Sequence, residues 1–124
     1  NRFVAEFVGR VNLITGAVTG WEAGTLSIAL DGGGHLWVAA PEAPAPGSVT
    51  VAVRPEALVV ESADAQLNGS NTVEAEVRSV AFLGDHYQYE LHAGSMSLLA
   101  QGRRVVNGER VKVHIPPDAC TVVA

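Results

Sequence analysis

The chain has 124 residues, of which 48% are apolar and 17% are charged. It is therefore long enough to bury a hydrophobic core and too apolar for a disordered protein. The formal net charge of −5, with a single lysine, argues against nucleic-acid binding, because phosphate contacts need clustered Lys and Arg. The single cysteine, Cys120, excludes an internal disulfide, and its apolar surroundings indicate a buried side chain rather than a nucleophile.

The first nine residues, NRFVAEFVG, predict a short helix over 1–9. Phe3 and Phe7 are four residues apart, and so are Val4 and Val8, which gives the helix one apolar face. Gly9 is a plausible end for it. Because so short a helix is marginal by itself, we expect it to be a connector from a preceding domain.

From residue 10 onward, apolar and polar residues alternate with a period of two, which predicts antiparallel strands with one solvated face. A glycine turn at 31–34 and a proline-rich loop at 41–47 separate the strands of the first half. The alternation changes phase between Val77 and Val80, which predicts a bulge. The segments with the clearest alternation are 25–30, 35–40, 48–53, 72–77, 86–91 and 110–115.

The sequence also repeats itself, with one copy over about 10–62 and a second over about 71–124. VAVRPEALVV, from residue 51, matches VHIPPDACTVV, from residue 113, and each copy has a glycine hairpin and a loop ending in glycine upstream of this phrase. Two copies are too few for a solenoid. We expect two similar β units of about five strands each, which pack together or exchange strands, as in small OB-type barrels.

Both copies keep a proline followed by an acid, Pro55-Glu56 and Pro117-Asp118. Proline cannot donate to a strand ladder, so a strand that ends here and restarts would move to another sheet. The acid could accept hydrogen bonds from free N–H groups in the turn. Arg54 is present in one copy only, which leaves two interpretations open: a surface arginine, or an ion pair or contact with another chain or domain.

No pattern in the sequence indicates catalysis, a metal site or a nucleotide loop. The four histidines lack the spacing of a metal pair, and there is no Walker A motif. Gly84-Asp85-His86 is better explained as a turn before a strand, because no nucleophile can be paired with it. Trp21 and Trp37 are more typical of core or interface aromatics than of a ligand cage.

Four segments in order resemble one family. NRFVAEFVGRVNLITG is similar to the junction after the ATPase domain of a bacterial ABC importer subunit, and VAVRPEAL resembles the V-R-P-E motif of the domain that follows. VEAEVRSVAFLGDHYQYELHAG, with Phe82-Leu83-Gly84 and Tyr87, and GERVKVHIPPDACTVV resemble the rest of that domain. The family is the C-terminal TOBE (transport-associated OB) domain of importers for polyamines, iron, sulfate or sugars.

The resemblance implies an all-β, OB-like domain over 10–124, with 1–9 as the connector from a missing ATPase domain. ATP and magnesium would bind in that missing part, so the resemblance implies no enzyme activity and no cofactor in this fragment. It implies a cytoplasmic accessory and regulatory role in solute import at the inner face of the membrane. The implied partners are the ATPase domain, a second copy in a homodimer, a regulator, and the permease by way of the ATPase domain, with no nucleic acid among them.

Two alternatives remain at this point: a small-ligand module that senses an oxyanion or a metal, and, less favoured, a nucleic-acid-binding OB domain. The residues that the motifs single out for structure or interaction are Arg54, Pro55, Glu56, Gly84, Asp85, Tyr87, Pro117 and Asp118.

Overall fold

The structure is a computed structural model that describes residues 11–30, 33–66 and 71–123, so the expected helix over 1–9 lies outside the described residues. The described chain is built from strands, joined by turns and two short 3-10 helices. In order these are β1 (Asn12–Glu22), β2 (Thr25–Leu30), β3 (His35–Ala39), β4 (Ser48–Val53), η1 (Pro55–Ala57), β5 (Val59–Ser62), β6 (Thr72–Phe82), β7 (Tyr87–Ala93), β8 (Met96–Gly102), β9 (Arg110–His114), η2 (Pro117–Ala119) and β10 (Thr121–Val122).

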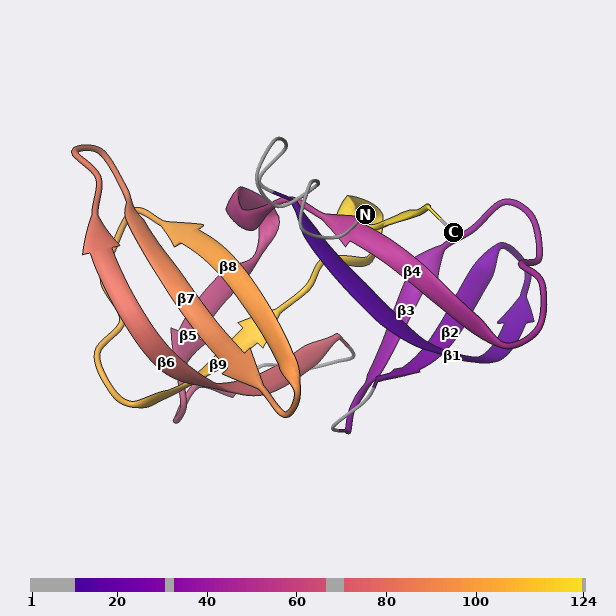
Figure 1. The fold of residues 1–124 in the computed structure, drawn as a ribbon, viewed down its shortest axis with the longest axis horizontal. Coiled ribbons are helices and arrows are strands. Elements are labelled where there is room, and N and C mark those ends of the chain that lie inside the picture. Colours follow the sequence, from indigo (N-terminus) through magenta and orange to yellow (C-terminus); the bar gives the residue numbers. More distant parts are fainter. Residues whose placement is uncertain (1–10, 31–32, 67–70, 124) are drawn as a thin grey trace.

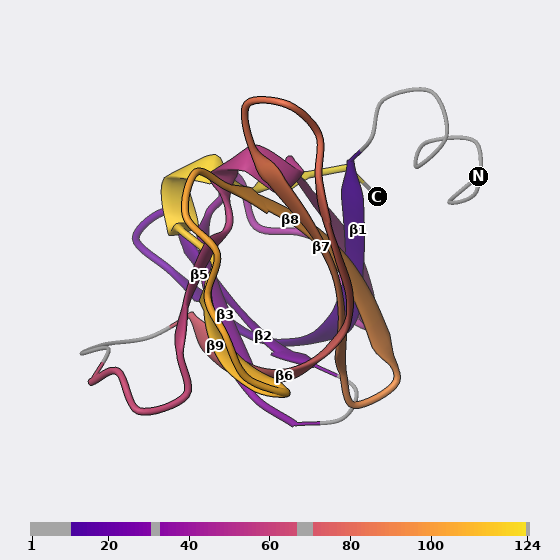
Figure 2. The same ribbon diagram turned by 90° about the vertical axis from the view of Figure 1, so that its left-hand side faces the viewer.

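The strands form two five-stranded sheets, each strongly curled, that lie side by side along the long axis of the molecule (Figure 1). The first unit has the order β10-β4-β1-β2-β3 and the second unit has the order β5-β9-β6-β7-β8. All the pairings within both sheets are antiparallel. The view along the long axis, with the second unit in front, shows the strands arranged as a ring (Figure 2). The all-β prediction is therefore confirmed.

The alternating pattern decides which side chains point inward. Leu26, Ile28 and Leu30 of β2 are buried, and so are Val111 and Val113 of β9, as the period of two predicts. These residues belong to the hydrophobic core, whose largest fully buried side chain is Tyr89. Several turns between strands contain glycines with positive φ, for example Gly47 at 110° and Gly108 at 123°.

Both long strands carry a bulge near their middle. The register of β6 against β7 shifts between Val77 and Ser79, where the sequence predicts a bulge. An equivalent shift occurs in β1 between Val18 and Gly20, which the sequence analysis did not identify. A bulge increases the local twist of a strand, and here it allows each long strand to curl around its unit.

The two units exchange their last strands. After β4 of the first unit, the chain passes through η1 and continues as β5, which pairs with β9 of the second unit. After β9, it passes through η2 and continues as β10, which pairs with β4 of the first unit. The proline-acid phrase therefore marks a change of sheet in both copies, as predicted, and each unit is completed by a strand from the other half.

The prolines and the acids of these kinks have different roles. Pro55 is buried, and Arg54 before it is extended (φ −76°, ψ 147°), as expected for a residue that precedes proline. The prediction that the acids accept hydrogen bonds in the turn is wrong. In the part of the chain that the structure describes, Glu56 and Asp118 are exposed and have no hydrogen-bond partner, because backbone carbonyls take the turn N–H groups instead.

Two buried asparagines connect the units. The side chain of Asn12 bonds both backbone groups of Leu99 in β8, with its oxygen and nitrogen each 2.8 Å from the partner atom. In the same way, Asn71 accepts from the N–H of Trp37 in β3 at 2.7 Å and donates to the carbonyl of Trp37 at 2.9 Å. Asn71 also donates to the Ile115 carbonyl at 2.8 Å. Each side-chain amide thus takes the place of a neighbouring strand at the edge of the other unit's sheet. It pairs with backbone N–H and C=O groups whose burial without a partner would cost free energy.

The strand exchange predicts that the two units unfold together. Leu36 and Leu98 are fully buried on the third strands of the first and second units, so Leu→Ala at either position should cost about 3 kcal/mol. We expect each variant to lower the midpoint of one common transition in urea, followed by far-ultraviolet circular dichroism. Two separate transitions, with only one of them shifted by each variant, would contradict the coupling.

The asparagine contacts predict a large effect from one small substitution. Asn71 has φ 67°, which glycine tolerates, so Asn71→Gly removes the side-chain hydrogen bonds without adding backbone strain. We expect a loss of roughly 3 kcal/mol in the free energy of unfolding, because buried peptide groups lose their partners. Asn107→Gly, at an exposed asparagine, is the matched control and should change stability by less than ~1 kcal/mol. Equal losses in the two variants would show that the contacts contribute little.

Candidate functional site

The region around η1 carries exposed charged side chains. Arg54 and Glu56 are both exposed, and within the described residues neither forms a salt bridge or a side-chain hydrogen bond. Among the described residues, the ion pair that formed part of the second interpretation of Arg54 is therefore not found, and a surface arginine or a contact with another chain or domain remains. β1 begins at Asn12, which pairs with Val53 of β4, so the start of β1 lies close to η1.

The turn between β6 and β7 projects beyond its unit (Figure 1). Its exposed side chains include large apolar ones. Phe82 is 58% exposed and Leu83 is 49% exposed, which makes them two of the most exposed large apolar residues in the described chain. The ring of Phe82 lies against that of Tyr87, with centroids 5.0 Å apart. The turn is closed by a hydrogen bond of 2.8 Å from the Leu83 N–H to the His86 carbonyl, so the exposed pair is presented on a defined loop.

Within this turn, Asp85 and His86 form a close pair. The Asp85 carboxylate lies 2.6 Å from Nδ1 of His86. This hydrogen bond, and next to it the charge of His86, holds the pKa of Asp85 below its usual value, while Arg103 adds a smaller effect in the same direction. Within the described residues, Nε2 of His86 is buried and has no hydrogen-bond partner. The contact between the two adjacent side chains helps to order the turn.

A cleft of about 360 Å³ joins η1, this turn and the end of β8. Glu56 comes from η1, Asp85 and His86 from the turn, and Arg103 from just beyond β8. We call the surface around this cleft the hairpin face, which consists of Glu56, Phe82, Leu83, Asp85 and Arg103. It combines exposed apolar groups with charges of both signs, which is the composition of a protein-binding surface rather than of a buried reaction site.

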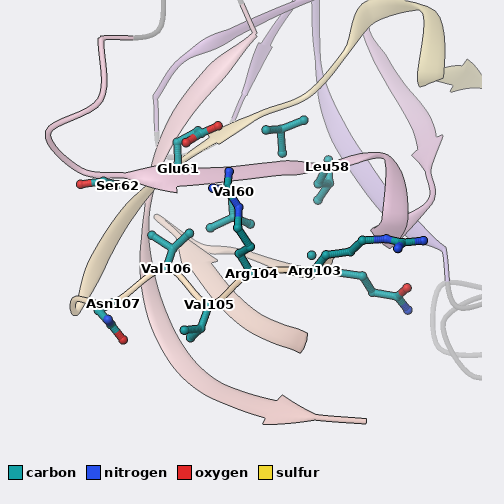
Figure 3. A pocket seen from close by; sticks show the side chains of 12 residues that line it. Leu58, Val60, Glu61, Ser62, Arg103, Arg104, Val105, Val106 and Asn107 are labelled. Carbon is teal, nitrogen blue, oxygen red and sulfur yellow. The ribbon is translucent and has the colours of Figure 1, made fainter. Parts of the chain in front are cut away.

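Next to the hairpin face, a groove of about 580 Å³ lies between β5 and the segment Gln101–Asn107 (Figure 3). Its wall is fixed by the hydroxyl of Tyr89, which donates to the Arg104 carbonyl at 3.0 Å and accepts from the Val106 N–H at 2.9 Å. In Figure 3 the side chain of Arg104 points toward β5, whereas that of Arg103 extends away toward η1. The groove therefore offers the Arg104 guanidinium beside a lining of apolar and polar side chains, Glu61 among them.

The fold brings together some of the residues that the motifs single out and separates others. Glu56 and Asp85 meet at the small cleft, with Arg54, Gly84 and Tyr87 close to them in the chain. Pro55 is part of the core. Pro117 and Asp118 lie in η2, which packs against β3 of the first unit and not against this cleft.

Sequence reasoning did not single out three members of the hairpin face. Arg103 was visible only as part of an Arg-Arg pair, and its position beside Glu56 depends on the contact between β8 and η1. Phe82 and Leu83 were identified as part of a family motif, but the alternation of apolar residues in β6 gave no sign that this end of the strand projects from its unit.

Other kinds of site find little support in the part of the chain that the structure describes. There, no three His, Cys, Asp or Glu side chains are grouped so that they could hold a metal ion. Burial, with a smaller contribution from Asp118, raises the pKa of the Cys120 thiol to about 11, which agrees with the prediction of an unreactive buried cysteine. No described helix is long and apolar enough to span a membrane.

Comparison with known proteins gives the family. A model of the TOBE domain matches residues 51–123. The spermidine/putrescine import ATP-binding protein PotA of Rubrobacter xylanophilus is 44% identical over 125 residues, which cover 98% of this chain and 31% of that protein. PotA of Ruegeria pomeroyi is 30% identical over 131 residues, which cover 99% of this chain and 34% of that protein. The chain therefore spans about a third of the length of these relatives.

A solved structure shows the same fold. It is that of the cytoplasmic molybdate-binding protein ModG with molybdate bound, which superposes with a TM-score of 0.75 and covers 90% of this chain and 94% of its own. At 15% identity, this likeness bears on the fold alone, and it supports the OB-like class expected from the sequence. The matching family model and the relatives aligned over nearly the whole chain show that the chain belongs to the TOBE domain family, as carried by the ATP-binding subunits of bacterial ABC importers.

Proposed function

We propose that this domain is the accessory and regulatory part of an importer ATPase subunit and acts through protein contacts at the hairpin face. The observation that carries the proposal is the exposure of Phe82 and Leu83 on an ordered turn. Asp85 of the same turn lines one cleft with Glu56 and Arg103. Exposed apolar side chains that are surrounded by polar groups are typical of an interaction site.

The relatives support the choice of partners. The first proposed partner is the ATP-binding part of the same subunit, because this chain spans only about a third of relatives that are ATP-binding proteins. A second copy of the subunit and a regulator are the further partners. In this proposal ATP and magnesium bind outside the domain, and the subunit works at the cytoplasmic face of the membrane with its permease.

The solute of the proposed importer is a polyamine. Both relatives described above are spermidine/putrescine import ATP-binding proteins, and their alignments cover 98% and 99% of this chain. The permease and a solute-binding protein would select the polyamine, so the domain itself need not contact it in transport.

The main test is self-association. We expect the domain to dimerise in light scattering as its concentration rises, and we expect Phe82→Ser with Leu83→Ser to weaken the dimer at least about tenfold, because exposed aromatic anchors dominate binding energies. Val123→Ser is the matched control, since Val123 is 53% exposed but lies next to the β10 strand of the first unit.

A wild-type domain that stays monomeric and does not bind the matching ATP-binding part would refute the proposal. Arg54→Ala separates the two interpretations of that residue: weakened association with unchanged stability would make Arg54 a contact residue. Lost stability with unchanged association would give it a purely structural role.

A small-ligand role is a second candidate, favoured by the groove that Arg103 and Arg104 line. A guanidinium beside backbone groups suits an oxyanion. We expect that, if this role exists, molybdate, tungstate or sulfate raises the melting temperature of the wild type and not of Arg104→Gln. No shift with any of the three anions would remove the support for this role.

A further inference from the structure

The sheet of the second unit leaves two edge strands unpaired, and both of them reach the groove of Figure 3. β5 and β8 are the edges of this sheet. The groove of about 580 Å³ is lined by residues 58–62, which include the whole of β5, and by Gln101 and Gly102 at the end of β8. The hydrogen bonds of the neighbouring strands decide which backbone groups of these edges point into it.

In β5, the backbone groups of every second residue point away from β9. The Ile115 N–H donates to the Asn71 carbonyl at 2.8 Å, so the odd-numbered residues of β9 bond to β6 and its even-numbered residues bond to β5. Val60 is opposite Val113, an odd-numbered residue, so the N–H and carbonyl of Val60 face the groove instead. Within the described residues, neither group has a hydrogen-bond partner. Ser62, two residues further on, has the same orientation.

The opposite edge already binds one amide group. The side chain of Asn12 bonds both the N–H and the carbonyl of Leu99, each at 2.8 Å, as a residue of a neighbouring strand would. These groups of Leu99 therefore point away from β7, and those of Gln101, two residues further along β8, do the same. Gln101 lines the groove. The groove thus begins one position beyond a place where an amide completes the edge of the sheet.

The charged side chains of the groove favour an acidic ligand. They are Glu61, Arg103 and Arg104. Arg104 points toward β5 (Figure 3), and in the part of the chain that the structure describes it is exposed and forms no salt bridge. Glu61 lies opposite Lys112 in the ladder, which offsets its charge. A carboxylate that enters the groove would therefore meet an unpaired guanidinium.

We propose that this groove binds an extended peptide segment of a partner protein, which adds to the free edge of β5 and places an acidic side chain at Arg104. An extended polypeptide presents N–H and C=O groups at the spacing of Val60 and Ser62. A compact anion would pair with Arg104 and leave the backbone of β5 as it is. The groove lies beside the hairpin face and is a separate surface, so this inference goes beyond the proposed function, and it competes with the small-anion role at Arg104.

The test follows the backbone amide resonances of the isotopically labelled domain in NMR while the peptide acetyl-Thr-Val-Glu-Val-Thr-amide is added. We expect the amides of Val60 and Ser62 to shift in a saturable way, with a dissociation constant on the order of 1 mM. Arg104→Gln should weaken binding about fivefold, the usual effect of losing one exposed ion pair. Arg110→Gln, at an exposed arginine of β9 that does not line the groove, should leave binding unchanged. The melting temperature of each variant shows that it is folded.

Two modified peptides distinguish strand addition from other binding. A strand bonds to its neighbour through every second residue, so N-methylation of the two valines and N-methylation of the glutamate remove different sets of donors. We expect one of these peptides to bind at least about tenfold more weakly and the other to keep its affinity. Equal affinities of the two, or the absence of a saturable shift at Val60 and Ser62, would overturn the proposal. Inorganic sulfate that displaces the peptide and shifts the same amides would assign the groove to a small anion instead, and shifts on dilution without peptide would assign it to a second copy.

Discussion

The structure depends on the need to pair strand edges. Each five-stranded sheet contains four strands from one half of the chain and one from the other, so neither half completes its sheet by itself. The proline at the end of β4 and at the end of β9 removes a donor and fixes the backbone angle, and in both places the chain then changes sheet. Asn12 and Asn71 complete the arrangement, because their amides bond the backbone of the third strand in the other unit. The connections through η1 and η2 therefore serve both to pair the sheet edges and to bury the core.

Much of this fold could be predicted from the sequence. The period of two gave β2 and β4 their observed bounds, the glycines marked turns, and the repeated proline-acid phrase indicated the change of sheet. The long strand β1 was not delimited, because its alternation is interrupted by glycines at 16 and 20 and by the bulge between Val18 and Gly20. The roles of Asn12 and Asn71 could not be predicted either. Their partners lie 87 and 34 residues away, and an asparagine at the start of a strand looks like an ordinary turn residue.

The candidate sites lie where the two copies of the repeat differ. The copies are similar where strands are exchanged, and they differ at the ends of the hairpins. In the second unit, the β6–β7 hairpin is longer and exposes Phe82 and Leu83, whereas in the first unit the β1–β2 hairpin is short and carries Trp21 beside an acid. Sequence alone pointed to Glu56 and Asp85, but their proximity depends on the packing of η1 against β8.

The segment 63–71, which joins β5 to β6, has a consequence for how the molecule assembles. One half of the chain alone would leave an unfilled place in its sheet, and two separate halves would fill each other's place only at sufficient concentration. Because the segment joins them covalently, the two halves experience an effective concentration on the order of millimolar, whatever the dilution in the cell. Because of the covalent link, the pairing of the two halves is a step of folding rather than an association equilibrium. The outer surfaces of the two halves can therefore change in sequence independently of each other.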